Sequence, residues 1–387
     1  MILKNVHICG GVHHESIGDL LIVNDKVVKV DSSNCNSVDN AISIKFPEDV
    51  IAYPGLINSH DHLALNTHSI FKKRVYNDYV EWAEDDFDNQ KKEITNIPFE
   101  LRCKWGILKN IIHGFTTVLQ HDKWSENLNS KVIDVHVKPR IIHSLRFDNR
   151  WKLKVLLPSR NKKIIHLAEG TNEEMCEESF ELLRYDMFPK KTVVVHGISL
   201  KEKEAKRFGG LIWCPNSNIY LYGKTAKIKE LKKSLPIMFG TDSTVSSDWD
   251  LWKHINQAKE SGALSEVELY NSLTEVPCKV FGLNEKGKIE DNKIADIVVS
   301  RKKENHVISS FLGQNSDDIL LIIKSGEIVL LDESVLEQVK SIISIGYFER
   351  IKIKQTTKFI KFPIENLVND IKKYYSSFKF EEYFILH

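Results

Sequence analysis

The 387-residue sequence has no surplus of charge of either sign. It contains 54 Lys and Arg residues against 53 Asp and Glu residues, which gives a formal net charge of +1. Proteins that bind nucleic acid or anionic membranes through their overall charge usually carry a clear positive excess. We therefore expect neither nucleic acid nor a membrane among the partners of this protein.

The sequence also lacks the segments that mark membrane-spanning and secreted proteins. No apolar run is long enough to span a bilayer, and the N-terminus, MILKNVHICGGVHHE, lacks the basic stretch and long apolar core of a secretion signal. The six cysteines are scattered and form no C-x-x-C pair. This usage favours reduced, mostly buried thiols in a cytoplasmic protein.

In the absence of repeats and low-complexity tracts, the middle of the chain alternates short apolar strands with helices. We expect helices over residues 99–112, 171–188 and 264–282, and strands over residues 115–122, 138–145, 163–169 and 192–200 and in GGLIWCPNSN and LPIMFGTDS. Strands that are apolar throughout and separated by helices predict a parallel sheet buried on both faces. The long alternation favours an α/β fold with a (β/α)₈ TIM-like barrel over an open sheet.

One region makes the predicted barrel look distorted. Between residues 120 and 163 only one clear strand is present, where two are needed, and residues 153–158 fit a strand or a helix end equally well. The chain ends differ from the middle, since residues 20–30 predict a hairpin and strands return after residue 288. We expect the N-terminal part of a small β-sandwich-like domain over residues 1–53, the barrel over residues 54–285, and the C-terminal part with a tail helix over residues 286–387.

The stretch YPGLINSHDHLALN ends a predicted strand with His60 and His62. Residues two apart on a strand face the same way, and neutral imidazole is the commonest side-chain ligand of transition metals. A lone His-x-His is weak evidence, because polar residues in a loop produce the same pattern.

Further candidate ligands lie at other predicted strand ends. HLAEG contains His166 and Glu169, VVVHG contains His196, and FGTDS contains Asp242. In a barrel the chemistry sits at the C-terminal ends of the strands, so these side chains would share one rim. Singly, each histidine suits a core position, Glu169 suits the first turn of a helix, and Asp242 suits a helix cap. Jointly they favour a site for zinc or ferrous iron.

The order PG-L-I-N-x-H-x-H, two strand histidines and G-T-D resembles the amidohydrolase superfamily of metal-dependent hydrolases. GFTTV, WCPNSN and NKIADIVV sit where corresponding blocks of that family lie, so the resemblance covers nearly the whole chain. His-Leu-Ala-Glu and CPNSN make the chain similar to the branch of guanine, cytosine and adenosine-analogue deaminases, triazine hydrolases and imidazolonepropionase.

The resemblance implies a mononuclear site that holds one divalent metal ion, zinc by preference and iron as the alternative. Its ligands would be His60, His62, His166 and Asp242, with His196 a further ligand or bonded to the metal's water. No lysine stands at a convincing strand-four end, which disfavours a two-metal site. Asp242 would take a proton from water. Glu169 would protonate a ring nitrogen and later help deliver a proton to the leaving amine, and His196 would polarise the substrate or steady the developing charge.

The implied activity is hydrolysis of a C–N bond in a small molecule, most simply deamination of an amino-substituted heterocycle. The alternatives are hydrolysis of a cyclic amide, as by imidazolonepropionase, and displacement of another leaving group, as by triazine hydrolases. A non-enzymatic metal-binding scaffold has no need of Glu169 beside an open metal position, which argues against it.

Substrate contacts are expected from loops at the rim. His121 is a pocket residue or a polar loop residue, Asn218 is a substrate contact or a turn residue, and Arg140 is the candidate for an arginine used by some purine deaminases. The insert over residues 77–95 is a lid or an acidic, solvated helix. A homodimer is compatible with the sequence.

Overall fold

The computed structural model describes residues 1–10, 15–30, 42–123, 130–341 and 343–386. Residues 11–14, 31–41, which include Cys35, and 124–129 lie outside the described residues. The cysteines within the described ranges are all free thiols, as expected.

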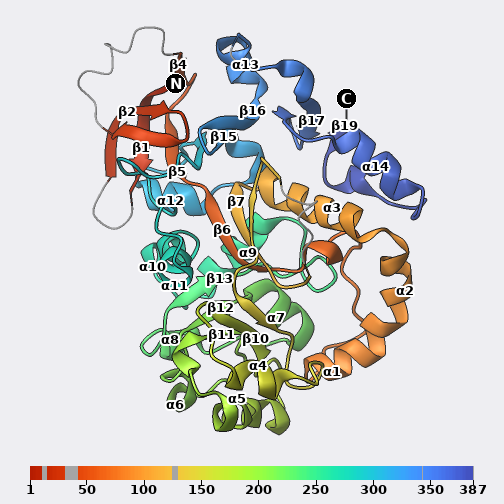
Figure 1. The fold of residues 1–387 in the computed structure, drawn as a ribbon. Coiled ribbons are helices and arrows are strands. Elements are labelled where there is room, and N and C mark those ends of the chain that lie inside the picture. Colours follow the sequence, from red (N-terminus) through yellow and green to blue (C-terminus); the bar gives the residue numbers. More distant parts are fainter. Residues whose placement is uncertain (11–14, 31–41, 124–129, 342, 387) are drawn as a thin grey trace.

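One 11-stranded sheet contains strands from both ends of the chain (Figure 1). It is joined by an antiparallel pair between β5 (Val50–Pro54) and β14 (Ile297–Arg301). Its N-terminal strands are β1 (Ile2–Cys9), β2 (Glu15–Val23), β3 (Lys26–Val30) and β4 (Ser43–Lys45). Its C-terminal strands are β15 (Ile319–Lys324), β16 (Glu327–Asp332), β17 (Glu349–Ile353), β18 (Thr356–Ile360) and β19 (Ile385–Leu386). The predicted hairpin is confirmed as the antiparallel pair of β2 and β3.

Two parallel sheets form the middle of the molecule. The five-stranded sheet has the order β13-β12-β11-β10-β9, and the three-stranded sheet has the order β6-β7-β8. The strands are β6 (Leu56–Asp61), β7 (Phe115–Gln120), β8 (Asp134–His136), β9 (Arg140–Ile142), β10 (Lys163–Leu167), β11 (Thr192–His196), β12 (Gly210–Trp213) and β13 (Ile237–Phe239). Apolar side chains of both sheets, including Ile57, Leu119, Ile164 and Met238, pack into one buried cluster. The predicted α/β class with parallel strands is confirmed.

The region between residues 120 and 163 differs from the regular alternation. Only residues 137–139 separate β8 from β9, so no helix lies between these strands. Residues 153–158 fall at the end of α4 (Trp151–Leu156), so reading them as the missing strand is wrong. The second strand is β8, and three residues are too few to show a period of two in the sequence.

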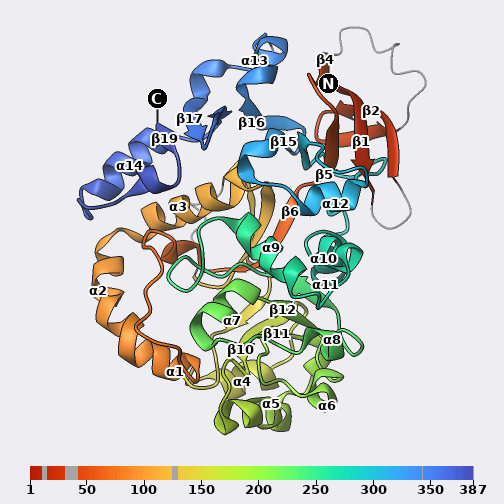
Figure 2. The same cartoon turned by 180° about the vertical axis from the view of Figure 1, so that it is seen from behind.

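Helices cover the outside of the parallel strands (Figure 2). α3 (Phe99–Ile112) and α5 (Glu173–Tyr185) lie where helices were predicted. The single helix predicted over residues 264–282 is instead α10 (Glu266–Ser272) and α11 (Glu275–Phe281). Pro277 has no N–H to donate to the carbonyl of Leu273, and that carbonyl accepts a hydrogen bond from Ile57 N at 2.9 Å instead.

The remaining helices are shorter connections, and most of them lie between the strands. They are α6 (Glu202–Ala205), α7 (Pro215–Tyr222), α8 (Ile228–Leu231), α9 (Leu251–Glu260), α12 (Val307–Leu312), α13 (Glu333–Val339) and α14 (Ile364–Lys372). The predicted tail helix is α14, which packs against α3. None of the helices in the described ranges combines the length and the apolar character that a bilayer span requires.

The insert after β6 forms a continuous arc along one side of the molecule (Figure 1). It consists of α1 (Tyr79–Trp82), a π-helical turn (Ala83–Phe87) and α2 (Asp88–Asn96). Asp78 begins the arc by accepting hydrogen bonds from the N–H groups of Val80 and Glu81. A π turn inside a helix often marks a functional region.

Candidate active site

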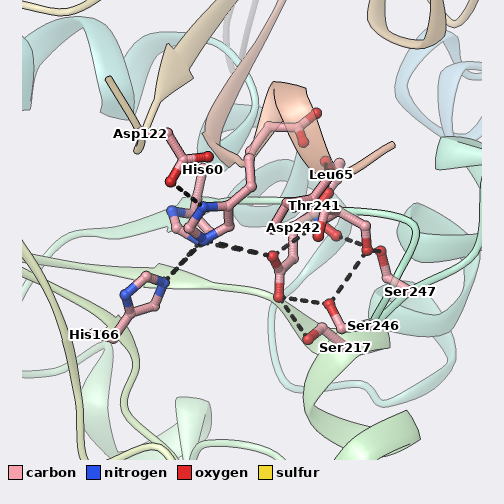
Figure 3. Close-up of polar contacts among 12 residues, drawn as sticks. His60, Leu65, Asp122, His166, Ser217, Thr241, Asp242, Ser246 and Ser247 are labelled. Atoms are coloured by element: carbon pink, nitrogen blue, oxygen red, sulfur yellow. Dashed lines mark hydrogen bonds and ion pairs between the residues drawn. The ribbon is translucent and has the colours of Figure 1, made fainter. Parts of the chain in front are cut away.

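Four histidines and one aspartate converge at the C-terminal ends of the parallel strands. Figure 3 shows His60, His166 and Asp242 among them. His60 lies in β6, His62 directly follows it, His166 lies in β10, His196 ends β11, and Asp242 follows β13. The Nε2 atom of His166 is 3.2 Å from that of His60 and 3.3 Å from that of His62. Asp242 Oδ1 is 3.9 Å and 4.0 Å from the Nε2 atoms of His60 and His62. The sequence-predicted ligands therefore meet in one place.

The backbone at this rim adopts conformations that non-glycine residues rarely accept. Ala168, His196 and Asp242 have φ values of 56°, 66° and 60°, in the left-handed region. Such residues cost on the order of 1–3 kcal/mol each and cluster at functional sites. Gly240 allows a close approach of two strand ends, because a Cβ atom there would lie 2.8 Å from Cβ of His60.

The hydrogen bonds of the imidazole rings direct their free nitrogens toward the centre. Nδ1 of His62 lies 3.0 Å from Asp122 Oδ1, Nδ1 of His166 lies 2.7 Å from a backbone carbonyl, and Nδ1 of His196 lies 2.7 Å from Asn218 Oδ1. Because these oxygens accept, Nδ1 carries the hydrogen, and a neutral ring then presents a lone pair at Nε2. Converging lone pairs and a carboxylate repel one another unless a cation lies between them. The donor set fits a divalent transition metal whose ligands are oriented from behind.

Burial keeps two of the rings neutral. Burial, followed by the neighbouring histidines, lowers the pKa of His60 and of His166 well below the usual value. Burial also lowers the pKa of His62, but the carboxylate of Asp122 outweighs it and raises that pKa to about 9. Burial opposes ionisation of Asp242, yet His196 and His62 and a hydrogen bond from a serine hold its pKa below the usual value. The centre thus offers the neutral imidazoles of His60 and His166 beside an ionised carboxylate.

Glu169 lies beside this centre without being one of the converging donors. Its Oε1 accepts a hydrogen bond from the hydroxyl of Tyr222 at 2.7 Å and is 3.6 Å from Nε2 of His196. Burial raises the pKa of the Glu169 carboxyl, against the opposing effects of His196 and Tyr222. A carboxyl of raised pKa that lines a cavity can hold a proton for a ligand.

A cavity of about 770 Å³ opens onto the centre. It is lined by His62, His166, Glu169, His196 and Asp242, and its volume lies within the range of small-molecule sites. The insert over residues 77–95, predicted as a lid or a solvated helix, supplies much of the wall through Tyr79, Trp82, Ala83, Phe87, Asp88, Lys91, Ile94 and Thr95.

The three predicted substrate contacts do not line this cavity. His121 is buried behind the histidines, with its ring centroid 4.2 Å from that of His166, and neither of its ring nitrogens has a partner among the described residues. Asn218 orients His196 and donates to Thr225. Arg140 is the first residue of β9, at the end of the strand away from the metal centre, where its guanidinium donates to three backbone carbonyls. The structure therefore does not place Arg140 at the substrate cavity, contrary to the expectation from the sequence.

Several residues at the centre were not singled out in the sequence. Asp122 bonds to His62, and the hydroxyls of Ser217 and Ser246 donate to Asp242 Oδ2 at 2.8 Å and 2.9 Å. Buried Lys109 donates to the carbonyl of Asp242 at 3.1 Å. Asp122 is the last residue of a predicted strand, which is a usable signal. The serines and the lysine have neighbours that only the fold brings to the site.

The chain matches the amidohydrolase family over residues 152–329. It is 20% identical over 397 residues to a 5-methylthioadenosine/S-adenosylhomocysteine deaminase from Pyrococcus horikoshii, an alignment that covers 84% of this chain and 93% of the relative. Among solved structures it resembles an adenosine deaminase from Xanthomonas campestris with bound zinc, at 14% identity and a TM-score of 0.76, with 97% of each chain covered. It also resembles an atrazine chlorohydrolase from Arthrobacter aurescens with zinc, at 14% identity and a TM-score of 0.70, with 96% and 99% covered.

Proposed function

The chain belongs to the amidohydrolase superfamily of metal-dependent hydrolases, and from this premise we propose that it deaminates an adenine-type heterocycle. The observation that carries the proposal is one arrangement at the strand ends. Imidazole nitrogens and Asp242 converge there, and Glu169 faces the same cavity without belonging to the converging donors. The name of the Pyrococcus relative supports a purine nucleoside as the substrate class.

The proposal includes the barrel that the family implies. We propose that β6 to β13 form one (β/α)₈ barrel, distorted by the missing helix between β8 and β9. Hydrogen bonds from the N–H groups of Thr241 and Asp242 to the carbonyl of His60, at 3.1 Å and 3.0 Å, support the closure. Residues 1–53 and 286–387 then make up the small β-sandwich-like domain, and residues 54–285 the barrel.

The donor set supports one divalent cation held by His60, His62, His166, His196 and Asp242. Zinc is the preferred ion, because two structures of this fold contain it, and iron is the alternative. A divalent cation in such a site lowers the pKa of a water molecule to about 7, which makes hydroxide available at neutral pH.

The protein groups then carry the proton transfers. Asp242 accepts a proton from the attacking water at Oδ1, while two serine hydroxyls hold Oδ2 in place. Glu169 gives its proton to the ring nitrogen next to the amino-bearing carbon, which makes that carbon electrophilic. His196 steadies the charge that develops there. Asp242 passes its proton to the amino group, which leaves as ammonia. The hydroxyl group added to the ring carbon gives its proton back to Glu169 as the ring carbonyl forms.

An ammonia-release screen tests this function. Zinc-loaded protein is offered 5-methylthioadenosine, S-adenosylhomocysteine and other aminopurines, aminopyrimidines, pterins and aminotriazines. We expect ammonia from adenine-type substrates and none from metal-stripped protein. If the panel yields no ammonia and a cyclic amide is hydrolysed, the imidazolonepropionase-like alternative holds. Release of chloride from a chlorotriazine would favour displacement of another leaving group.

The setting of the enzyme is part of the proposal. Free thiols among the described cysteines support the reducing cytoplasm as its location. A homodimer stays a prediction that sedimentation of the purified chain would test.

A further inference from the structure

Arg102 is a buried cation in the wall of the active-site cavity. It projects from α3, is 8% exposed and lines the same cavity as His62 and Glu169. Its Nε donates to the carbonyl of Ile97 and its Nη1 to the carbonyl of Ala64, both at 2.9 Å. Its Nη2 makes no hydrogen bond to any residue that the structure describes. Two backbone carbonyls therefore fix the guanidinium and leave part of it available.

No carboxylate in the described part of the chain forms an ion pair with Arg102. Burial lowers the pKa of this guanidinium, and Asp122 is the side chain of the cavity whose negative charge opposes that effect. The carboxylate of Asp122, however, is hydrogen-bonded to Nδ1 of His62. A buried cation without a counter-charge is costly, because buried charges are normally paired. An anionic ligand in the cavity would supply the missing charge.

The cavity has room for a substituent that reaches from the metal centre toward Arg102. The carbonyl of Ala64 accepts a hydrogen bond from the guanidinium of Arg102, and Ala64 lies two residues after His62. Arg102 therefore lies close to the edge of the metal centre. Leu65, Trp82, Phe87 and Val245 give the cavity a largely apolar wall. Such a wall favours the body of a substituent, and a single charged group at its edge favours an anionic end.

We propose that the site selects adenine-type substrates whose substituent ends in an anion, a carboxylate or a phosphate, which Arg102 binds. The inference rests on the proposed deaminase function and narrows its substrate class. A guanidinium binds a carboxylate and a phosphate in the same way, through paired N–H donors, so Arg102 could recognise either anion. Neutral nucleosides lack the group that would compensate this buried charge.

Substrate pairs in wild type and in Arg102→Gln test the proposal. S-adenosylhomocysteine offers a carboxylate, adenosine 5′-monophosphate offers a phosphate, and 5-methylthioadenosine and adenosine are neutral. We expect Arg102→Gln to lower kcat/KM for the anionic substrate on the order of 10- to 100-fold, with a change below about threefold for the neutral ones. The neutral substrates thus report whether the variant is folded. Lys104→Gln removes the same charge from an exposed position of the same helix and should change neither.

The results for S-adenosylhomocysteine and adenosine 5′-monophosphate, together with a binding measurement, distinguish the possible outcomes. A selective loss on S-adenosylhomocysteine identifies a carboxylate, and a selective loss on the monophosphate identifies a phosphate. Equal kcat/KM for neutral and anionic substrates in wild type, or equal losses on both in Arg102→Gln, overturns the proposal. If no nucleoside releases ammonia, the deaminase function fails instead. Thermal shifts of the metal-free protein by the same compounds then still test Arg102, since the anionic ones should stabilise wild type and not Arg102→Gln.

Discussion

At the scale of single residues, the centre depends on which nitrogen of each imidazole is free. Asp122, a backbone carbonyl and Asn218 occupy Nδ1 of His62, His166 and His196, so Nε2 of each ring faces the centre. These partners were not proposed as such from the sequence. They determine the direction of the lone pairs, and ligands oriented in this way bind a metal more tightly than free rings.

Glu169 gives the prediction that belongs to this scale. Glu169→Gln removes the acidic proton, keeps the size of the side chain and leaves the proposed ligands unchanged. We expect the metal content to stay the same while kcat falls on the order of 10²- to 10⁴-fold, as for loss of a general acid. Metal analysis and ammonia release measure the two effects. Glu173→Gln, on the exposed first turn of α5, is the matched control. Loss of metal in Glu169→Gln would make Glu169 a ligand.

At the scale of elements, polar side chains on one face of helix α3 contact the loops that carry the metal centre. Gly106 lets the helix approach, because a Cβ atom there would lie 2.4 Å from the carbonyl of Leu63. Lys109, which is 0% exposed, donates to Asn66 Oδ1 at 2.6 Å and to the carbonyl of Asp242 at 3.1 Å. Its Nζ is 3.0 Å from Asp61 Oδ2, in the middle of the His-Asp-His sequence. One lysine thus connects the end of β6 with the loop after β13.

A double-mutant cycle separates the two effects of Lys109. Lys109→Met leaves the carboxylate of Asp61 buried without its cation, which should lower the free energy of unfolding by about 3–5 kcal/mol. Adding Asp61→Asn removes that charge and should restore much of the stability. The carbonyl of Asp242 still lacks the hydrogen bond from Lys109 and keeps only the one from the Thr241 hydroxyl. We therefore expect kcat of the double variant to remain about tenfold or more below wild type. Urea unfolding and ammonia release measure the cycle. A wild-type kcat in the double variant would show that Lys109 only neutralises the charge of Asp61 and does not position Asp242.

At the scale of the whole molecule, buried side chains tie the cavity wall to the parallel strands. Glu178 of α5 accepts hydrogen bonds from Ala168 N at 2.9 Å and from the hydroxyl of Tyr79 at 3.0 Å. It therefore joins the end of β10 to the insert that lines the cavity. Arg146 Nε lies 3.9 Å away, and the carboxyl of Glu169 also acts on it. Burial, against these donors, raises the pKa of Glu178 to about 7.

This raised pKa predicts a pH-dependent contribution to the stability of the whole fold. The folded protein binds the proton of Glu178 more tightly than the unfolded chain, where the pKa is 4.5. The contribution is full below pH 4.5 and is lost as the pH rises through about 7. Glu178→Gln keeps a neutral side chain at all pH values. Relative to wild type, its free energy of unfolding should rise by about 3 kcal/mol between pH 4 and pH 8.5, measured by urea unfolding. A difference that does not change with pH would contradict the prediction.

The sequence predicted the elements whose pattern is local and long enough. Helix α3 and the hairpin of β2 and β3 follow from apolar spacing and turn residues alone. Strand β8 did not follow from the sequence, because three residues are too few to show a period. The break between α10 and α11 did not follow either, because the carbonyl of Leu273 accepts its hydrogen bond from Ile57, which is distant in the chain.

The sequence by itself determined which residue types stand at the strand ends. Imidazoles and carboxylates are recognisable there because a parallel barrel brings its strand ends to one rim, so the sequence alone indicates His60, His166 and Asp242. Only the tertiary structure decided their surroundings. It excluded Arg140 from the cavity, turned Asn218 toward His196, and left Arg102 buried without a carboxylate. Burial, hydrogen-bond direction and charge pairing depend on neighbours from distant segments, and no local pattern in the chain encodes them.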